Sequence, residues 1–498
     1  MAGLVDVFAT DPTVAACLDA AVVGVRTLDV TLPEAARPLL TAALTSRSDA
    51  PVLLVTSTFR EAEAATAMLG SLLSPDEVAY YPAWETLPHE RLSPRSDTVG
   101  RRLTVLRRLL GNDPLPAPRV VVAPVRALLQ PQVVGLGNLL PVHLVAGRDY
   151  DITEVARALV DAAYIRVDLV ERRGEFCVRG GIIDVFPPTS EHPVRIDFFG
   201  DTIEEIRPFS VADQRSMDES LPEITASPCR EMLITDAVKA RAAQLAQRYA
   251  NVEGTLGELF DRISQGHAVD GMEALAPVLV DGLELLVDVL PATTRILVSD
   301  PERIRARAHE LVTTSEEFLN ASWAAAAEGG KEPIDLGASA YRTHADVRSH
   351  ALGRGQAWWS LSPFSSGDVE AVPGAPAGQG AGVQHLDQQG GDAAHHHAGE
   401  GAVDLPAGAV GAEEAHVPAV ALDRVVAVAA DQLADLQDDG LAKIGRTKIG
   451  GALSIRALAI RVLAVGAGFW SGGRRHGQDK IVAAAATQSL AAATAPQS

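Results

Sequence analysis

The chain has 498 residues, of which 47% are hydrophobic and 21% charged, so it is long enough for two to four domains of roughly 100–200 residues. Its 43 Lys and Arg against 64 Asp and Glu give a formal net charge of -21, which disfavours a polybasic nucleic-acid binder because a polyanion repels a net anion. Aromatic residues make up only 4%, too few for an extended base-stacking surface.

Three widely separated cysteines, Cys17, Cys177 and Cys229, fit a reducing compartment and have no metal-ligand spacing. We expect them to be small buried thiols. The N-terminal segment lacks the basic start and apolar run of a signal peptide, and the apolar stretch at 455–465 contains two arginines and is too short to span a bilayer. The expected location is the cytoplasm, with no membrane partner.

The composition changes near residue 365. The last 134 residues contain 32 Ala and 20 Gly, and such a segment buries too little apolar surface to offset chain entropy. We therefore expect 365–498 to be a low-complexity, disordered C-terminal tail or the product of a shifted reading frame. The histidine run at 395–397 fits a solvated tract better than a metal site, since no neighbouring ligands complete a coordination shell.

The first 364 residues have the pattern of an α/β protein. Short apolar runs rich in Val predict buried strands, and amphipathic segments between them predict helices. Strands that alternate with helices favour an open, mainly parallel sheet. The expected strands are 51–56, 78–81 and 119–123, and the expected helices are 59–69, 96–110 and 151–163.

From residue 165 the pattern changes to consecutive short strands with turns between them, which indicates an inserted antiparallel sheet. Helices then return at 236–249 and 256–264, followed by a strand at 295–299 and a helix at 301–325. The predicted domains are thus 1–148 and 229–364, two parts of one α/β domain, interrupted by a β-rich domain at 149–228. The expected strands of the insertion are 166–171, 175–178, 182–186, 194–199 and 203–209.

Motifs for catalysis are missing from the sequence. No G-x-x-x-x-G-K-[ST] phosphate loop occurs, and the segment from Leu32 to Leu44, before the strand at 51–56, has neither glycine nor lysine. Asp300 follows an apolar strand. Capping the N-terminus of the next helix is a simpler role for this residue than binding a metal. We predict no catalytic residue, no cofactor and no metal for this chain.

Arginines and phenylalanines gather in the β-rich insertion, as in a protein-binding hot spot, with Arg179, Arg195 and Arg207 beside Phe198, Phe199 and Phe209. The period of two along a strand places Arg195 and Phe199 on its more polar face. Outside the insertion, Arg101, Arg102, Arg107 and Arg108 form a basic stretch on the helix at 96–110. This stretch favours a solvated helix face, with DNA binding as the weaker alternative.

Five strings in order resemble the N-terminal part of the bacterial transcription-repair coupling factor family (Mfd), of an actinobacterial type. The resemblance covers about residue 30 to Phe364. The strings are Trp84–Leu103 (WETLPHERLSPRSDTVGRRL), Val122–Gln130 (VAPVRALLQ), Arg173–Pro188 (RGEFCVRGGIIDVFPP), Val194–Asp201 (VRIDFFGD) and Phe209–Ser216 (FSVADQRS).

This resemblance implies a UvrB-like, degenerate helicase-like α/β domain without a working nucleotide site, split by an inserted β domain that binds UvrA. The UvrA-contacting residues of the family fall on Arg179, Arg195 and Phe199. The full-length family also binds RNA polymerase and DNA and uses ATP and Mg, through regions that we do not recognise in this sequence. The expected function is recruitment of UvrA in transcription-coupled nucleotide excision repair. The alternatives are an ATP-dependent DNA translocase, as in the full-length family, and a truncated UvrB-like damage-recognition protein.

Overall fold

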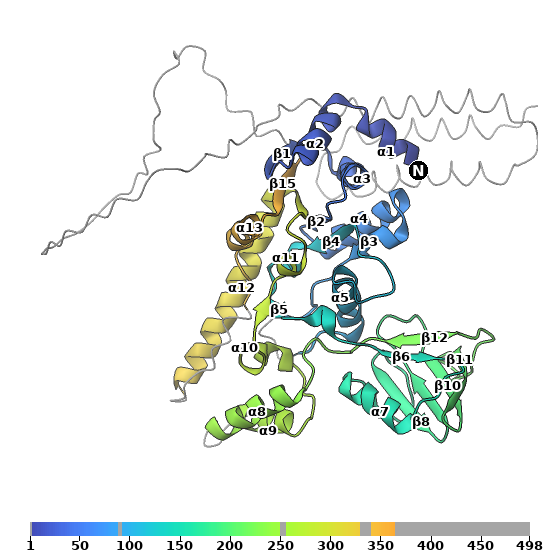
Figure 1. The fold of residues 1–498 in the computed structure, drawn as a ribbon. Coiled ribbons are helices and arrows are strands. Elements are labelled where there is room, and N and C mark those ends of the chain that lie inside the picture. The colour runs from blue at the N-terminus through green and yellow to red at the C-terminus, as the bar shows by residue number, and fades with distance from the viewer. Residues whose placement is uncertain (1, 88–91, 250–254, 329–339, 364–498) are drawn as a thin grey trace, which may run out of the picture. The chain divides into compact units, whose positions relative to one another are not determined.

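The computed structural model describes residues 2–87, 92–249, 255–328 and 340–363 (Figure 1). The predictions for the tail at 365–498, including its histidine run, lie outside these residues. Both predicted sheets are present, which confirms the α/β class with a parallel sheet and a separate antiparallel sheet. Among the described helices, none is long and apolar enough to cross a membrane.

The larger sheet has six strands, all paired in parallel, in the order β1-β15-β14-β2-β4-β3. The four strands that the sequence predicted for it are confirmed, because β2, β4 and β14 are completely buried and have apolar centres, and β3 pairs with β4. Two further strands, β1 and β15, were not predicted. The bounds are β1 Thr27–Thr31, β2 Val52–Thr56, β3 Val78–Tyr80, β4 Val120–Pro124, β14 Arg295–Ser299 and β15 Ala357–Ser362.

Helices pack on this sheet through their apolar stripes. Helix α5 buries Leu103 and Leu106 completely in the core that it shares with residues of β2 and β4, whereas Leu110, which follows it at the same spacing, is exposed. Helix α4 begins at the N-cap Thr58, whose side chain accepts a hydrogen bond from the backbone of Glu61. The bounds are α1 Ala2–Ala9, α2 Pro12–Val23, α3 Arg37–Arg47, α4 Phe59–Leu72, α5 Ser96–Leu109, α6 Val125–Leu129, α11 Leu286–Val289, α12 Pro301–Glu328 and α13 His344–Gly353.

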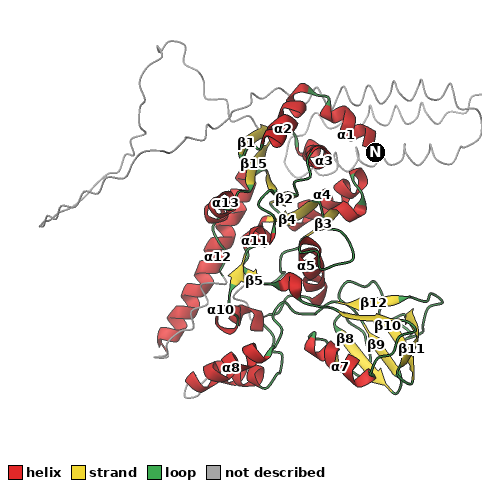
Figure 2. Cartoon of the chain, viewed as in Figure 1, coloured by secondary structure: helices red, strands yellow, loops and turns green. Residues whose placement is uncertain are grey.

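The second sheet, of five strands in the order β11-β10-β9-β8-β7, forms the insertion (Figure 2). Strands β8 to β11 are antiparallel, as predicted. The expected strand 166–171 was wrong in length: only Ile165 and Arg166 pair, in parallel with β8, because the chain beyond them turns over the sheet and buries Val170 against Cys177 and Phe209. The bounds are β7 Ile165–Arg166, β8 Glu175–Arg179, β9 Ile182–Val185, β10 Val194–Phe199 and β11 Thr202–Pro208.

Helix α7 (Ile152–Asp161) and the strand pair β6 (Val142–Val145) and β12 (Glu223–Ala226) complete the core of the insertion. Leu144 on β6 and Ile224 on β12 share this core with residues of β8 to β11, so strand β6, upstream of the expected domain start at 149, packs with the inserted sheet. Downstream, α8 (Asp236–Arg248), α9 (Thr255–Ser264) and α10 (Ala276–Leu279) form a small helical cluster, and β13 (Leu283–Glu284) pairs with β5 (Gln132–Val133). The chain then returns to the parallel sheet through β14.

Candidate protein-interaction site

The two faces of the antiparallel sheet differ in chemistry. On β10, Val194 and Ile196 are buried and Phe198 packs against the same core, whereas Arg195, Asp197 and Phe199 alternate onto the opposite face. The alternation that the sequence predicted for this strand is therefore confirmed. The register between β10 and β11 shifts at Asp197 and Phe198, where β11 has one extra residue, Glu204. Because the extra residue is on β11, the side chains of β10 keep their period of two.

Phe199 lies at the end of β10, where the turn to β11 begins. Its side chain is 80% exposed, although phenylalanine rings are usually buried. Gly200, which follows, has a φ of +66°, a backbone conformation that glycine adopts without strain and that sets the turn. An exposed ring on a rigid hairpin is available to fill an apolar pocket of a partner.

Arg179 lies at the end of β8 and is exposed. Its Nη2 donates to the carbonyl oxygen of Asp168 at 2.7 Å, and its Nε donates to Sγ of Cys177 at 3.1 Å. Within the described part of the chain, no carboxylate forms an ion pair with Arg179. Its guanidinium is thus held in place by neutral groups and keeps its positive charge for an external carboxylate.

Arg195 is less accessible than the sequence suggested, since only 19% of its side chain is exposed. Its Nε and Nη2 donate to the two carboxylate oxygens of Asp184 at 2.7 and 2.9 Å, and its guanidinium carbon lies 5.0 Å from the centre of the Phe209 ring. Asp184 is 2% exposed and was not predicted as a functional residue. The sequence contains one indication of this role: Asp184 is a carboxylate inside the apolar run Ile182–Phe186, and a buried charge needs a partner.

Arg207, the third arginine of this face, is neutralised within the sheet. Its guanidinium contacts Glu205 at 3.3 Å and Asp197 at 3.5 Å. The strand register gathers the exposed groups at one end of the sheet: Arg179 pairs with Ile182, Ile182 with Asp197, and the amide of Phe198 donates to the carbonyl of Gly181 at 2.8 Å. Arg179 and Phe199 thus lie on the same face, near adjacent turns.

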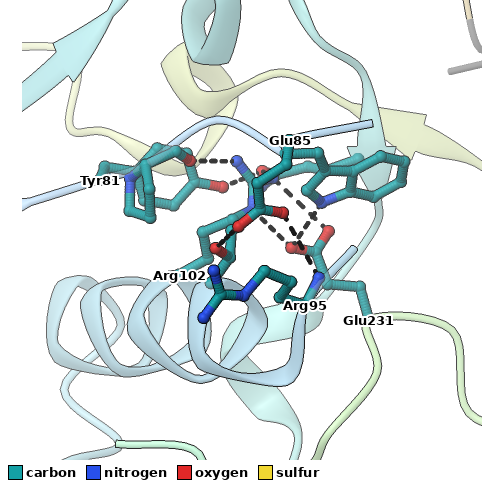
Figure 3. Close-up of polar contacts among 9 residues, drawn as sticks. Tyr81, Glu85, Arg95, Arg102 and Glu231 are labelled. Atoms are coloured by element: carbon teal, nitrogen blue, oxygen red, sulfur yellow. Dashed lines mark hydrogen bonds and ion pairs between the residues drawn. The ribbon is translucent and has the colours of Figure 1, made fainter. Parts of the chain in front are cut away.

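A buried polar cluster holds the connections of the insertion against helix α5 (Figure 3). The Nε of Arg102 contacts Glu231 Oε1 at 2.5 Å, and its other nitrogens donate to the Pro82 carbonyl at 2.9 Å and to Gln132 Oε1 at 3.1 Å. The Trp84 indole also donates to Glu231, at 3.1 Å. Glu231 follows the last strand of the insertion, and Gln132 precedes its first strand, so Arg102 ties both connections to one helix.

The basic stretch on helix α5 does not form an exposed surface. Arg102, Arg107 and Arg108 are at most 6% exposed, so both the solvated-face and the DNA-binding interpretations were wrong for these three residues. Carbonyl oxygens of surrounding loops explain their burial: Arg107 donates to Leu139 and Asn112, and Arg108 donates to Pro116 and Asp76. Only Arg101 of the four is exposed.

Glycine at position 100 lets the insertion approach the same helix. A Cβ atom on Gly100 would lie 2.5 Å from Cβ of Pro188, in the loop between β9 and β10. Ser96, one turn earlier, donates to the carbonyl of Arg173 at 3.0 Å. Helix α5 therefore provides a platform for the insertion through Ser96, Gly100 and Arg102.

At the carboxyl edge of the parallel sheet, where many α/β proteins bind ligands, side chains of this chain contact one another. Between β1 and α3 the chain runs through Leu32, Pro33 and a short 3-10 helix at Glu34–Ala36, and Arg37 then donates to Oγ of Ser299 at 2.8 Å. Asp300 accepts a hydrogen bond from the Arg303 amide at 3.3 Å, which confirms it as the N-cap of α12. Among the described residues, no group of three His, Cys, Asp or Glu side chains is placed to hold a metal.

Comparisons with known proteins agree with this architecture. Residues 142–232 match the family described as the UvrB interaction domain, a range that begins at β6 and ends just after Glu231. The chain is 47% identical over 397 residues to a transcription-repair-coupling factor of Mycobacterium bovis, which covers 75% of this chain and 32% of that protein. The corresponding protein of Bacillus subtilis is 31% identical over 304 residues, covering 58% of this chain and 25% of the relative.

The transcription-repair-coupling factor of Escherichia coli is 28% identical over 317 residues, which is 61% of this chain and 25% of the relative. The chain thus spans at most about a third of the length of these relatives. Residues 142–232 are similar to a UvrB interaction domain, and 75% of the chain is similar to the transcription-repair-coupling factor of Mycobacterium bovis.

Proposed function

We propose that this chain recruits UvrA in transcription-coupled nucleotide excision repair, through the polar face of the sheet formed by β8 to β11. The observation that carries the proposal is the pair Arg179 and Phe199, an arginine without a carboxylate partner among the described residues and a ring that is 80% exposed, on one face of the matched domain. An arginine beside an aromatic anchor is the usual composition of a binding hot spot. The partner follows from the resemblance to the coupling factor family.

The proposal does not include nucleotide hydrolysis, so we expect no ATP or Mg requirement. Its support is the loop from Leu32 to Arg37, which contains no glycine and ends in an arginine engaged with Ser299. In the full-length family, the resemblance assigns RNA polymerase binding, DNA binding and translocation to other regions, and we do not propose them for the described residues. An ATPase assay with and without DNA separates this proposal from the translocase alternative, which requires DNA-stimulated turnover.

The direct test is the affinity of the full chain for UvrA, measured by calorimetry with single substitutions. We expect Arg179→Ala and Phe199→Ala each to weaken binding by ~1–2 kcal/mol, or about 5- to 30-fold in Kd. Matched controls lie outside the insertion: Phe59→Ala removes a ring that is 57% exposed on α4, and Arg305→Ala removes an exposed arginine of α12. Binding that is unchanged in both insertion variants would remove the site assignment.

A further inference from the structure

The ion pair between Asp184 and Arg195 lies in the middle of the proposed interaction face. Cys177 on β8, Asp184 on β9 and Arg195 on β10 are direct cross-strand neighbours, so their side chains form one row across the sheet. Asp184 is 2% exposed and is engaged by both Nε and Nη2 of Arg195. This geometry neutralises the charge of Arg195 and fixes the plane of its guanidinium.

The same guanidinium supports the two segments that lie on this face. Its Nη1 donates to the carbonyl of Gln214 at 3.3 Å, and Gln214 has a φ of +59°, uncommon for a residue with a side chain. The Gln214 amide in turn donates to the carbonyl of Val170 at 3.3 Å. Two residues before Val170, the carbonyl of Asp168 holds the guanidinium of Arg179. A continuous set of hydrogen-bonded segments thus joins Arg195 to Arg179.

We propose that Asp184 and Arg195 are positioning residues of the UvrA interface: together they fix the segments 167–170 and 209–216, and those segments orient Arg179. Direct contact is then made by Arg179, against a carboxylate of the partner, and by Phe199, in an apolar pocket of the partner. This inference rests on the proposed function. It assigns different roles to residues that the family resemblance had treated alike.

The test compares single and paired substitutions in the full chain, with UvrA affinity and amide hydrogen exchange as readouts. Arg195→Ala leaves Asp184 buried without a partner, and we expect at least about 10-fold weaker binding and faster exchange in 209–216. The pair Asp184→Leu with Arg195→Met replaces the ion pair by apolar side chains of similar length. Because a methionine at position 195 cannot donate to the Gln214 carbonyl, we expect the pair to recover the stability lost in Arg195→Ala but to keep the weaker binding and the faster exchange in 209–216. Affinity and exchange in the pair at the level of the unsubstituted chain would overturn the proposal.

The salt dependence of binding provides a readout that a purely structural role does not change, because exposed charges are screened by salt. We expect weaker binding at high salt in the unsubstituted chain and in the pair Asp184→Leu with Arg195→Met, and loss of this dependence in Arg179→Ala only. Loss of the dependence in the pair as well would show that Arg195 meets the partner directly.

Failure of the proposed function is recognised separately. If the unsubstituted chain does not bind UvrA, the proposed function is wrong, and exchange alone decides the positioning role. Asp184→Asn and Arg195→Lys must then each speed exchange in both 167–170 and 209–216. Exchange that stays at the level of the unsubstituted chain in either segment would overturn that role, even if the variants remain fully folded.

Discussion

Glu231→Gln tests whether the buried ion pair with Arg102 holds the insertion against helix α5. The substitution keeps the size of the side chain and removes its charge. The side chains of Arg102 and Glu231 are 0% and 1% exposed, so water does not screen the pair. Burial alone would lower the pKa of Arg102, but the neighbouring carboxylate of Glu231 outweighs it, and the pKa of Arg102 is raised. The variant therefore leaves a charged guanidinium in the interior.

The expected cost follows from this burial. Removing one partner of a buried ion pair destabilises a protein by about 3–5 kcal/mol, because the remaining charge is desolvated without compensation. Arg102 keeps its hydrogen bonds to Pro82 and Gln132, which favours the lower end of this range. For a domain of this size, each kcal/mol lowers Tm by roughly 2–4 °C, so we expect a decrease of at least about 6 °C.

Urea and thermal unfolding of the full chain measure the effect, and Glu154→Gln is the matched control. Glu154 pairs with Arg157 on helix α7 at 2.7 Å, but the two side chains are 68% and 61% exposed, so its loss should cost less than about 0.5 kcal/mol. Amide exchange at 227–235 reports whether the connection loosens. A change below about 1 kcal/mol in Glu231→Gln would refute the role of the pair, and so would unchanged exchange at 227–235.

Three further predictions concern the same platform and the buried ionisable groups. Gly100→Ala should destabilise by about 1–3 kcal/mol because its Cβ would overlap Pro188, whereas Gly70→Ala on α4, with no atom within 4 Å, should stabilise by about 0.5–1 kcal/mol; equal effects in urea unfolding would contradict the close approach. Trp84→Phe removes the indole donor to Glu231 and should lower the free energy of unfolding by about 1–3 kcal/mol in the same assay. An unchanged free energy of unfolding would show that this hydrogen bond does not stabilise the fold. Burial raises the pKa of Cys229 to about 12 and, with help from Asp11, that of Cys17 to about 11. Since unfolded thiols ionise near 9, the stability that these two thiols contribute should be constant below pH 9 and be lost between about pH 9 and 12. An unfolding free energy that stays flat from pH 8 to 11 would exclude this linkage.

The sequence predicted the elements whose signal is local. Strands β2, β4 and β14 were found because every residue in them is buried and the runs are rich in Val, Leu and Ile. Strand β1 was missed because Asp29 interrupts its short apolar pattern, and β15 because Ser360 interrupts its apolar pattern after Trp359. Both strands depend on pairing with each other across more than 300 residues, which no local window contains.

The same limit explains the site residues. The exposed Phe199 followed from the period of two on one strand, a local property. The burial of Arg102 could not be predicted in this way, because its partner Glu231 is 129 residues away. The sequence of its helix alone, with four arginines, indicates a basic surface. Arg195 was predicted on the correct face, but its neutralisation by Asp184 depends on the register between β9 and β10, which the sequence does not contain.

The way this acidic chain uses its arginines bears on the kind of partner that it fits. On helix α5, Arg102, Arg107 and Arg108 bind internal oxygens, and on the polar face of the antiparallel sheet Arg195 and Arg207 are paired with carboxylates. Binding to nucleic acid needs several cations that neutralise phosphates together. Of the three arginines on β8, β10 and β11, Arg179 alone keeps an unpaired charge among the described residues. Arg179 beside an exposed Phe199 fits a protein surface with a carboxylate next to an apolar pocket.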